Sequence, residues 1–148
     1  MIVGIAHLFT QVKENIAKQR NIQISGYVDS SEVSCVNNRA AQICTLDALL
    51  FEHRKKYGTQ FNGLNGKAAL HHKLLLKYQW PLSTIRELTL PDILLSLQDE
   101  LRVENLPEDI SRYLSQVTLS QFPVNFADHP ESEWDPNLAE RLLVDLEK

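Results

Sequence analysis

Apolar residues recur every three or four positions along most of this chain, and this period restricts it to a largely helical fold. A first amphipathic helix is predicted to end near Arg20. A second is predicted to run from Ser30 or Ser31, either of which can cap its start, to Tyr57, with Gly58 as its stop. The apolar positions of the first helix are Ile2, Ile5, Phe9, Val12 and Ile16.

Start and stop signals predict the remaining helices. A third helix covers residues 67–80 and ends at Pro81, and a terminal helix covers residues 136–147. Three short helices between them are expected to begin at a capping box, or at an early Pro followed by an acid. These starts are Thr84 with Glu87, Thr89-Leu90-Pro91-Asp92, and Asn105-Leu106-Pro107-Glu108. The helix that begins at Thr89 would carry Ile93, Leu94, Leu97 and Leu101 on its apolar side.

Two segments depart from the helical period. Residues 22–28 alternate apolar and polar side chains around a glycine, as a strand does, and one short strand cannot form a sheet alone. This segment is therefore either an extended connector or a strand that pairs with a copy in another subunit. Residues 118–135 contain prolines and several acids, which predicts an irregular, solvated arm. Taken together, these patterns predict that residues 1–148 form a single compact all-α domain of six or seven helices.

Charge is divided unevenly along the chain. Residues 1–86 contain eleven Lys or Arg and five Asp or Glu, whereas residues 87–148 contain four and fourteen. Halves of +6 and −10 therefore underlie the net charge of −4. Regions of opposite charge can attract each other within one fold or between two copies of the chain, and each can also attract other molecules of opposite charge. The asymmetry favours a function based on contacts with partners, and it specifies no reaction.

The chain lacks the signals of a membrane or exported protein. Its longest apolar runs, such as Leu74-Leu75-Leu76, are far shorter than the roughly 18 residues of a membrane span. Its first residues show neither the basic region nor the cleavage site of a signal peptide. Cys35 and Cys44 fall on opposite sides of the predicted second helix, which argues against a disulfide between them. We therefore expect reduced thiols, a cytoplasmic location and no membrane partner.

Motifs for catalysis, cofactors or metals are not found. The run Gly63-Leu64-Asn65-Gly66-Lys67 fails the spacing of a phosphate-binding loop, and Ala68 stands where Ser or Thr would bind magnesium. His71 and His72 point about 100° apart on a helix, and His53 lies on the preceding helix, so chance clustering is a better interpretation than zinc. No nucleophile elbow is present. We predict a non-enzymatic protein without catalytic residue, cofactor or metal.

Residues 54–77 form a basic segment with interleaved aromatic residues and no acid. Two interpretations stay open: the segment pairs with the acidic half, within the fold or across a dimer, or it contacts nucleic-acid phosphates. A helix-turn-helix is weakly supported, because the helix predicted after Pro81 is too short to present several base-reading side chains. The candidate cations are Arg54, Lys55, Lys56, Lys67, Lys73 and Lys77.

Residues 26–98 also resemble a known family. The runs GYVDSSEV, NNRAAQICTLDALLFEHRKKYG and GKAALHHKLLLKYQWPLSTIRELTLPDILLSL are similar to small prophage-associated proteins of enteric bacteria, a family without an assigned biochemical activity. The resemblance implies a bacterial cytoplasmic protein with an accessory role in a prophage region, such as regulation, host takeover or interference with a host protein. It carries over no catalytic or binding residue.

These observations predict a protein-interaction module, expected to be a homodimer, that binds a host or phage protein. The alternative is a nucleic-acid-binding regulator that uses the basic residues 54–77. The terminal helix 136–147 needs a groove to cover its leucines, and a second chain could supply it. The candidate interface residues are Leu138, Leu142, Leu143 and Leu146.

Overall fold

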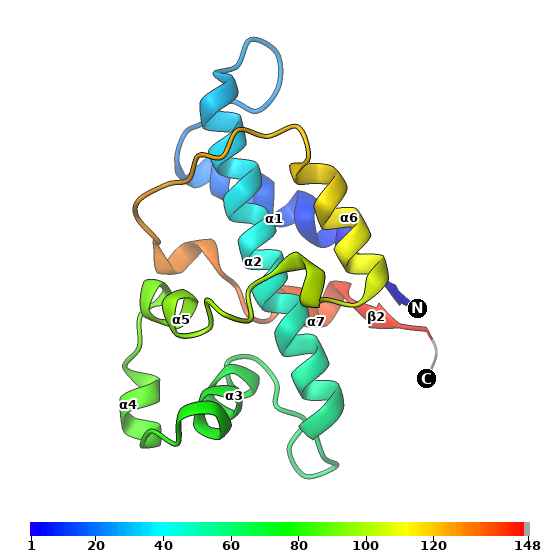
Figure 1. The fold of residues 1–148 in the computed structure, drawn as a ribbon, viewed down its shortest axis with the longest axis vertical. Coiled ribbons are helices and arrows are strands. Elements are labelled where there is room, and N and C mark those ends of the chain that lie inside the picture. The colour runs from blue at the N-terminus through cyan, green and yellow to red at the C-terminus, as the bar shows by residue number, and fades with distance from the viewer. Residues whose placement is uncertain (147–148) are drawn as a thin grey trace.

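A computed structural model of the protein describes residues 1–146 and shows an all-α fold with seven α-helices in that range, as the sequence predicts (Figure 1). Two 3-10 helices and one two-stranded antiparallel sheet complete it. The elements are β1 (Ile2–Val3), α1 (Ile5–Gln19), α2 (Ser30–Tyr57), α3 (Ala68–Tyr78), α4 (Leu82–Arg86), α5 (Leu90–Ser96), η1 (Val103–Asn105), α6 (Glu108–Thr118), η2 (Glu131–Glu133), α7 (Leu138–Leu142) and β2 (Val144–Asp145).

The 28-residue helix α2 is the centre of the fold and contacts α1, α3, α6 and α7. At 1.5 Å per residue it is about 42 Å long. Its cap is Asp29 rather than either serine: the carboxylate accepts hydrogen bonds from the backbone N–H groups of Ser31 (2.8 Å) and Glu32 (3.1 Å). The helix stops at Gly58 as predicted, and the Gly58 N–H donates to the Arg54 carbonyl at 2.7 Å.

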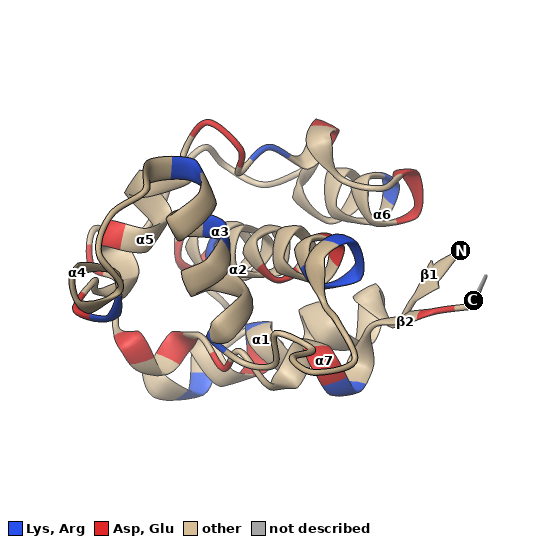
Figure 2. Cartoon of the chain, turned by 90° about the horizontal axis from the view of Figure 1, so that it is seen from below, with Lys and Arg blue, Asp and Glu red and all other residues tan. Residues whose placement is uncertain are grey.

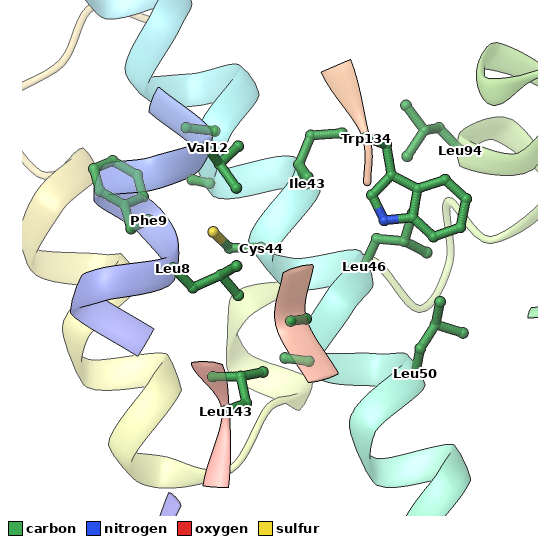
Figure 3. Close-up of a cluster of buried hydrophobic side chains, with 14 of the residues drawn as sticks. Leu8, Phe9, Val12, Ile43, Cys44, Leu46, Leu50, Leu94, Trp134 and Leu143 are labelled. Atoms are coloured by element: carbon green, nitrogen blue, oxygen red, sulfur yellow. The ribbon is translucent and has the colours of Figure 1, made fainter. Parts of the chain in front are cut away.

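The middle of α2 is buried around most of its circumference, and the core forms on its several sides. Small residues such as Ala40 and Ala48 are fully buried, which lets neighbouring helices approach closely. Figure 3 shows these layers: side chains of α1 meet one side of α2, and side chains of α5 and the 130s meet another. The core residues labelled there are Leu8, Phe9, Val12, Ile43, Cys44, Leu46, Leu50, Leu94, Trp134 and Leu143.

The N-terminus forms a strand before the first helix. The helix was predicted to include Ile2, but Ile2–Val3 pair with Val144–Asp145, and α1 begins only at Ile5. Gly4 makes the turn between them with φ 99°, and a Cβ there would overlap the backbone oxygen of Leu142. All five predicted apolar positions are nevertheless buried.

The two helices after the 58–67 loop differ from their predicted ends. Helix α3 ends at Tyr78, two residues early, because Gln79 adopts the left-handed conformation with φ 58°. The predicted capping box of Thr84 and Glu87 does not form. Helix α4 begins at Leu82, three residues before the start that a Thr84 cap implies, and Pro81 takes the N-cap position.

Helix α5 begins as the sequence predicts, whereas α6 begins two residues later than predicted, because Asn105 ends η1 and Pro107 takes the N-cap position of α6. The Asp92 carboxylate accepts hydrogen bonds from the Thr89 backbone N–H (3.3 Å) and hydroxyl (2.9 Å), which makes this capping box a correct prediction. Helix α5 is shorter than expected, however: it ends at Ser96, so the buried Leu97 follows the helix. In α6, which begins at Glu108, Ile110 and Leu114 face the core.

The C-terminal region is more tightly packed than predicted. Residues 118–135 are irregular apart from η2, yet Glu133 is 2% exposed, which contradicts a solvated arm. The terminal helix covers only Leu138–Leu142, because the chain then extends as β2 to pair with β1; position 147 lies outside the described residues. None of the helices in residues 1–146 combines the length and hydropathy needed to cross a bilayer.

Candidate functional site

Four of the six candidate cations form ion pairs with the acidic half of the same chain. Lys56 and Lys67 form no ion pair with any residue in the described range 1–146. Figure 2 shows blue and red segments interspersed over the elements rather than separated on two faces. The four pairs are Arg54 with Glu140 (3.7 Å), Lys55 with Asp145 (2.5 Å), Lys73 with Glu100 (2.7 Å) and Lys77 with Asp99 (2.6 Å).

The glycine-containing loop 63–67, which precedes α3, also contacts an acidic side chain of the same chain. The backbone N–H of Gly66 donates a hydrogen bond to the Glu140 carboxylate, and Arg54 pairs with the same Oε1 atom. A phosphate in this loop would compete with that carboxylate for the same N–H group. The contact therefore gives the loop a structural partner within the chain.

A groove of about 400 Å³ lies between α2 and α3. Helix α2 supplies side chains at three- and four-residue spacing, so that they share one face, and α3 supplies the facing wall. Glu100, from the turn after α5, lies at the groove and bridges the two α3 lysines, at 2.7 and 2.9 Å. The lining residues are Leu49, Glu52, His53, Lys56, Tyr57, Lys73, Leu76, Lys77 and Glu100.

His53 and Tyr57 line one side of this groove, and His72 contacts both of them from behind that lining. His53 Nε2 lies 2.8 Å from His72 Nδ1, a hydrogen bond in which one ring donates and the other accepts. The Tyr57 ring lies 4.6 Å from the His53 ring and 5.4 Å from the His72 ring. Burial, then the nearby charges of Lys73 and His72, lower the pKa of His53 to about 4. His53 is therefore neutral at pH 7, and His71, predicted alongside it, takes no part in this pair.

A buried ion-pair network attaches the 126–133 segment to α1 and α2. The Glu133 carboxylate accepts from Arg39 Nη1 at 2.6 Å and from Arg20 Nε at 2.7 Å. Arg39 also donates to the Phe126 carbonyl at 2.9 Å, and the Arg20 guanidinium lies 3.7 Å from the Phe126 ring centre. Asp128 adds an exposed pair to Arg20 at 3.0 Å. Because each charge of this network has a partner, we assign it to structure.

Asp47 is, with Glu133, one of two buried acids in the described residues that sequence reasoning missed. Its side chain accepts a hydrogen bond from Trp134 Nε1 at 2.8 Å and lies beside a cavity of about 330 Å³ that Glu133 and Asp135 also line. Burial raises the pKa of Asp47 to about 7, despite the opposing effects of that hydrogen bond and of Arg54. The sequence contained a signal for this burial, since position 47 continues the apolar face of α2.

Neither cysteine forms a disulfide. Cys44 is buried in the core, which raises the pKa of its thiol, and Cys35 is half-buried; both are free. Within residues 1–146, no group of three or more His, Cys, Asp or Glu side chains is arranged to hold a metal ion.

The candidate interface leucines do not share one surface. Leu143 is buried, Leu138 and Leu142 are half-buried against the core, and only Leu146 is exposed. Helix α7 packs on α1 and α2 of its own chain. The same chain thus supplies the groove that the sequence suggested a second copy would provide.

An exposed apolar region lies instead at the N-terminal end of α2. The residues before α2 form a loop at the top of Figure 1, near the segment that follows α6. Ser34 and Asn38 anchor that second segment by hydrogen bonds to the Phe122 N–H (3.1 Å) and carbonyl (2.8 Å). The exposed apolar side chains of the two segments are Tyr27, Val28, Leu119 and Phe122.

Comparisons with known proteins give no match: no family model, no curated protein and no solved structure is similar to this chain.

Proposed function

We propose that the protein is a non-enzymatic interaction module that assembles as a homodimer through residues 21–28. This proposal rests on the lack of backbone hydrogen bonds in that segment and on its exposure. Residues 23–28 make no backbone–backbone hydrogen bond with the described chain, and the side chain of Tyr27 is fully exposed. The backbone bends at residues 25–27, where Gly26 has φ 78° and the Ser25 carbonyl accepts a hydrogen bond from the Gln23 side chain at 2.8 Å. Within this loop, backbone N–H and C=O groups without a backbone partner are a template for pairing with a strand of another chain.

Charge favours a second copy as the strand that pairs there. Residues 21–28 contain no charged side chain, so two copies can meet along this segment without the repulsion that a net charge of −4 would otherwise cause. The flanks are complementary: exposed Lys18 precedes the segment and exposed Glu32 follows it. Antiparallel pairing about a twofold axis turns the basic flank of one copy toward the acidic flank of the other.

Sedimentation velocity over about 1–100 μM protein tests the dimer, since interfaces of modest area commonly dissociate in the micromolar range. We expect the wild type to form dimers and Tyr27→Arg to be monomeric, because it places two like charges in the interface. Phe61→Arg is the matched control, as Phe61 is equally an exposed aromatic residue but lies in the loop after α2. A wild type that stays monomeric, or a Tyr27→Arg variant that still dimerises, refutes the proposal.

The dimer would present Leu119 and Phe122, the exposed apolar side chains of the segment after α6, to a further protein. The resemblance of residues 26–98 to prophage-associated proteins implies that this partner belongs to the host or the phage. The nucleic-acid alternative stays a prediction, but four of its six cations are already paired with acids of the same chain. Anisotropy of a labelled duplex at about 50 and 200 mM salt tests it, because phosphate-driven binding falls by orders of magnitude between them.

A further inference from the structure

The groove between α2 and α3 contains one acid and one base that the fold does not pair. Lys73 and Lys77 are occupied by Glu100 and Asp99. Glu52 and Lys56 form no ion pair with any residue in the described range. A Glu and a Lys four residues apart on a helix ordinarily attract each other.

The conformation of Lys56 explains why that pair does not form. Its ammonium lies over the Tyr57 ring, 5.2 Å from the ring centre, in a cation–π contact. Glu52 and Lys56 therefore remain available as separate charges, one negative and one positive, at the same groove. A ligand that carries both signs can meet both of them.

Between these charges the groove offers apolar and aromatic surface. Leu49 from α2 and Leu76 from α3 line it, and Leu76 is 49% exposed although it is a large apolar side chain. Tyr57 adds an aromatic face that the His53–His72 contacts hold in place. An apolar surface with a few convergent polar groups, at about 400 Å³, has the character of a small-molecule site.

We propose that this groove binds a free α-amino acid with an aromatic or aliphatic side chain. The ligand carboxylate would pair with Lys56, its ammonium with Glu52, and its side chain would cover Leu49, Leu76 and Tyr57. A ligand with one charge would leave either Glu52 or Lys56 without a partner, so the arrangement selects a zwitterion. The site lies on the α2–α3 face and is independent of the proposed dimer segment at the other end of α2.

Isothermal titration with L-phenylalanine tests the site directly. 3-Phenylpropionate lacks the ammonium and 2-phenylethylamine lacks the carboxylate, so each removes one of the two charge contacts. We expect L-phenylalanine to bind with a Kd below about 10 mM and each analogue to bind about tenfold or more weakly, the effect of losing one charged hydrogen bond. Failure of L-phenylalanine to bind, or equal binding of either analogue, overturns the proposal.

Two variants locate the binding. Glu52→Gln and Lys56→Gln each remove one charge from side chains that are not in the core, and each should weaken L-phenylalanine about tenfold while circular dichroism stays unchanged. Lys67→Gln is the control, since it removes an equally unpaired lysine outside the groove. The His53 and His72 ring resonances should shift on addition of ligand to the wild type. Binding that all three variants retain would place the ligand elsewhere and overturn the assignment.

Discussion

The indole Nε1–H of Trp134 donates a 2.8 Å hydrogen bond to the carboxylate of Asp47, and both side chains are buried. The two residues are 87 positions apart, so this bond fastens the irregular C-terminal segment to the centre of α2. Together with the Arg39–Glu133 pair it places charged groups in the interior, where their protonation and pairing affect the free energy of unfolding.

Asp47 should make the protein less stable as the pH rises. Its folded pKa of about 7 lies above the ordinary value of 3.8, so the folded state holds a proton that the unfolded state releases between these values. The free energy of unfolding should therefore fall as the pH rises from about 4 to 7. Since one pKa unit is worth about 1.4 kcal/mol, urea denaturation at pH 5 and pH 8 should differ by roughly 2–3 kcal/mol from this group.

The Asp47→Asn variant isolates this effect. Its side-chain amide cannot titrate, so the stability of the wild type relative to the variant should decrease between pH 5 and pH 8. His53 contributes equally to both proteins, and the comparison cancels it. Glu104→Gln, at an exposed acid, should leave the pH dependence of the wild type unchanged. A constant difference between wild type and Asp47→Asn across this pH range would show that Asp47 is ionised throughout.

His53 should stay neutral in mildly acidic solution. Burial holds its folded pKa near 4, below the ordinary 6.5, so the unfolded state takes up a proton first and stability should decline as the pH falls from about 6.5 to 4. An NMR titration of the His53 ring should give a midpoint near 4. A midpoint above 6 would mean that the His53–His72 hydrogen bond opens to water.

Loss of the Glu133 charge should strongly destabilise the protein. Glu133→Gln leaves the guanidinium of Arg39, which is 2% exposed, without its counter-ion, together with that of Arg20. Breaking a buried ion pair costs about 3–5 kcal/mol, which urea denaturation measures directly. Asp128→Asn is the matched control, because Asp128 pairs with Arg20 from an exposed position and should cost less than about 1 kcal/mol. Equal effects of the two substitutions would contradict a structural role for the network.

Helical periodicity was sufficient to predict the all-α class, the end of α2 and, to within two residues, its start, because the apolar pattern and a clear stop signal coincide there. It failed for the terminal helix, since residues 144–145 pair with residues 2–3, and a contact between the two ends of a chain leaves no local signal. The burial of Glu133 likewise leaves no local signal in the sequence. Glu133 stands in a polar segment, and only the positions of Arg20 and Arg39 in the fold reveal that it is buried.

The groove was only partly accessible from the sequence. Lys56, Lys73 and Lys77 were recognised as cations from the sequence. Which of them form ion pairs, however, depends on the positions of Asp99 and Glu100 in the fold. The His53–His72 contact joins two helices whose relative rotation is set by core packing. Side-chain spacing within one helix could be predicted, whereas convergence between helices could not.

Gly4→Ala should destabilise the fold. Gly4 has φ 99°, and an added Cβ would overlap the Leu142 backbone oxygen, so either the turn into α1 or the end of α7 must move. We expect a loss of about 2 kcal/mol or more, seen as a lower Tm. Gly63→Ala is the control, because the Cβ there would meet only the Asn65 side chain, which can rotate away. A Gly4→Ala variant as stable as Gly63→Ala would show that this turn is not constrained.

Gln79→Gly should stabilise the protein. Gln79 is exposed and ends α3 in the left-handed conformation, with φ 58°, where a residue with a Cβ is strained and glycine is not. Glycine also gains freedom in the unfolded chain, so the net increase in stability should be about 0.5–1 kcal/mol, or a few degrees in Tm. Gln79→Ala retains the Cβ and should give no increase. Equal melting temperatures for the Gly and Ala variants would mean that the α3 end carries no strain, whereas a higher value for glycine alone assigns the gain to the backbone.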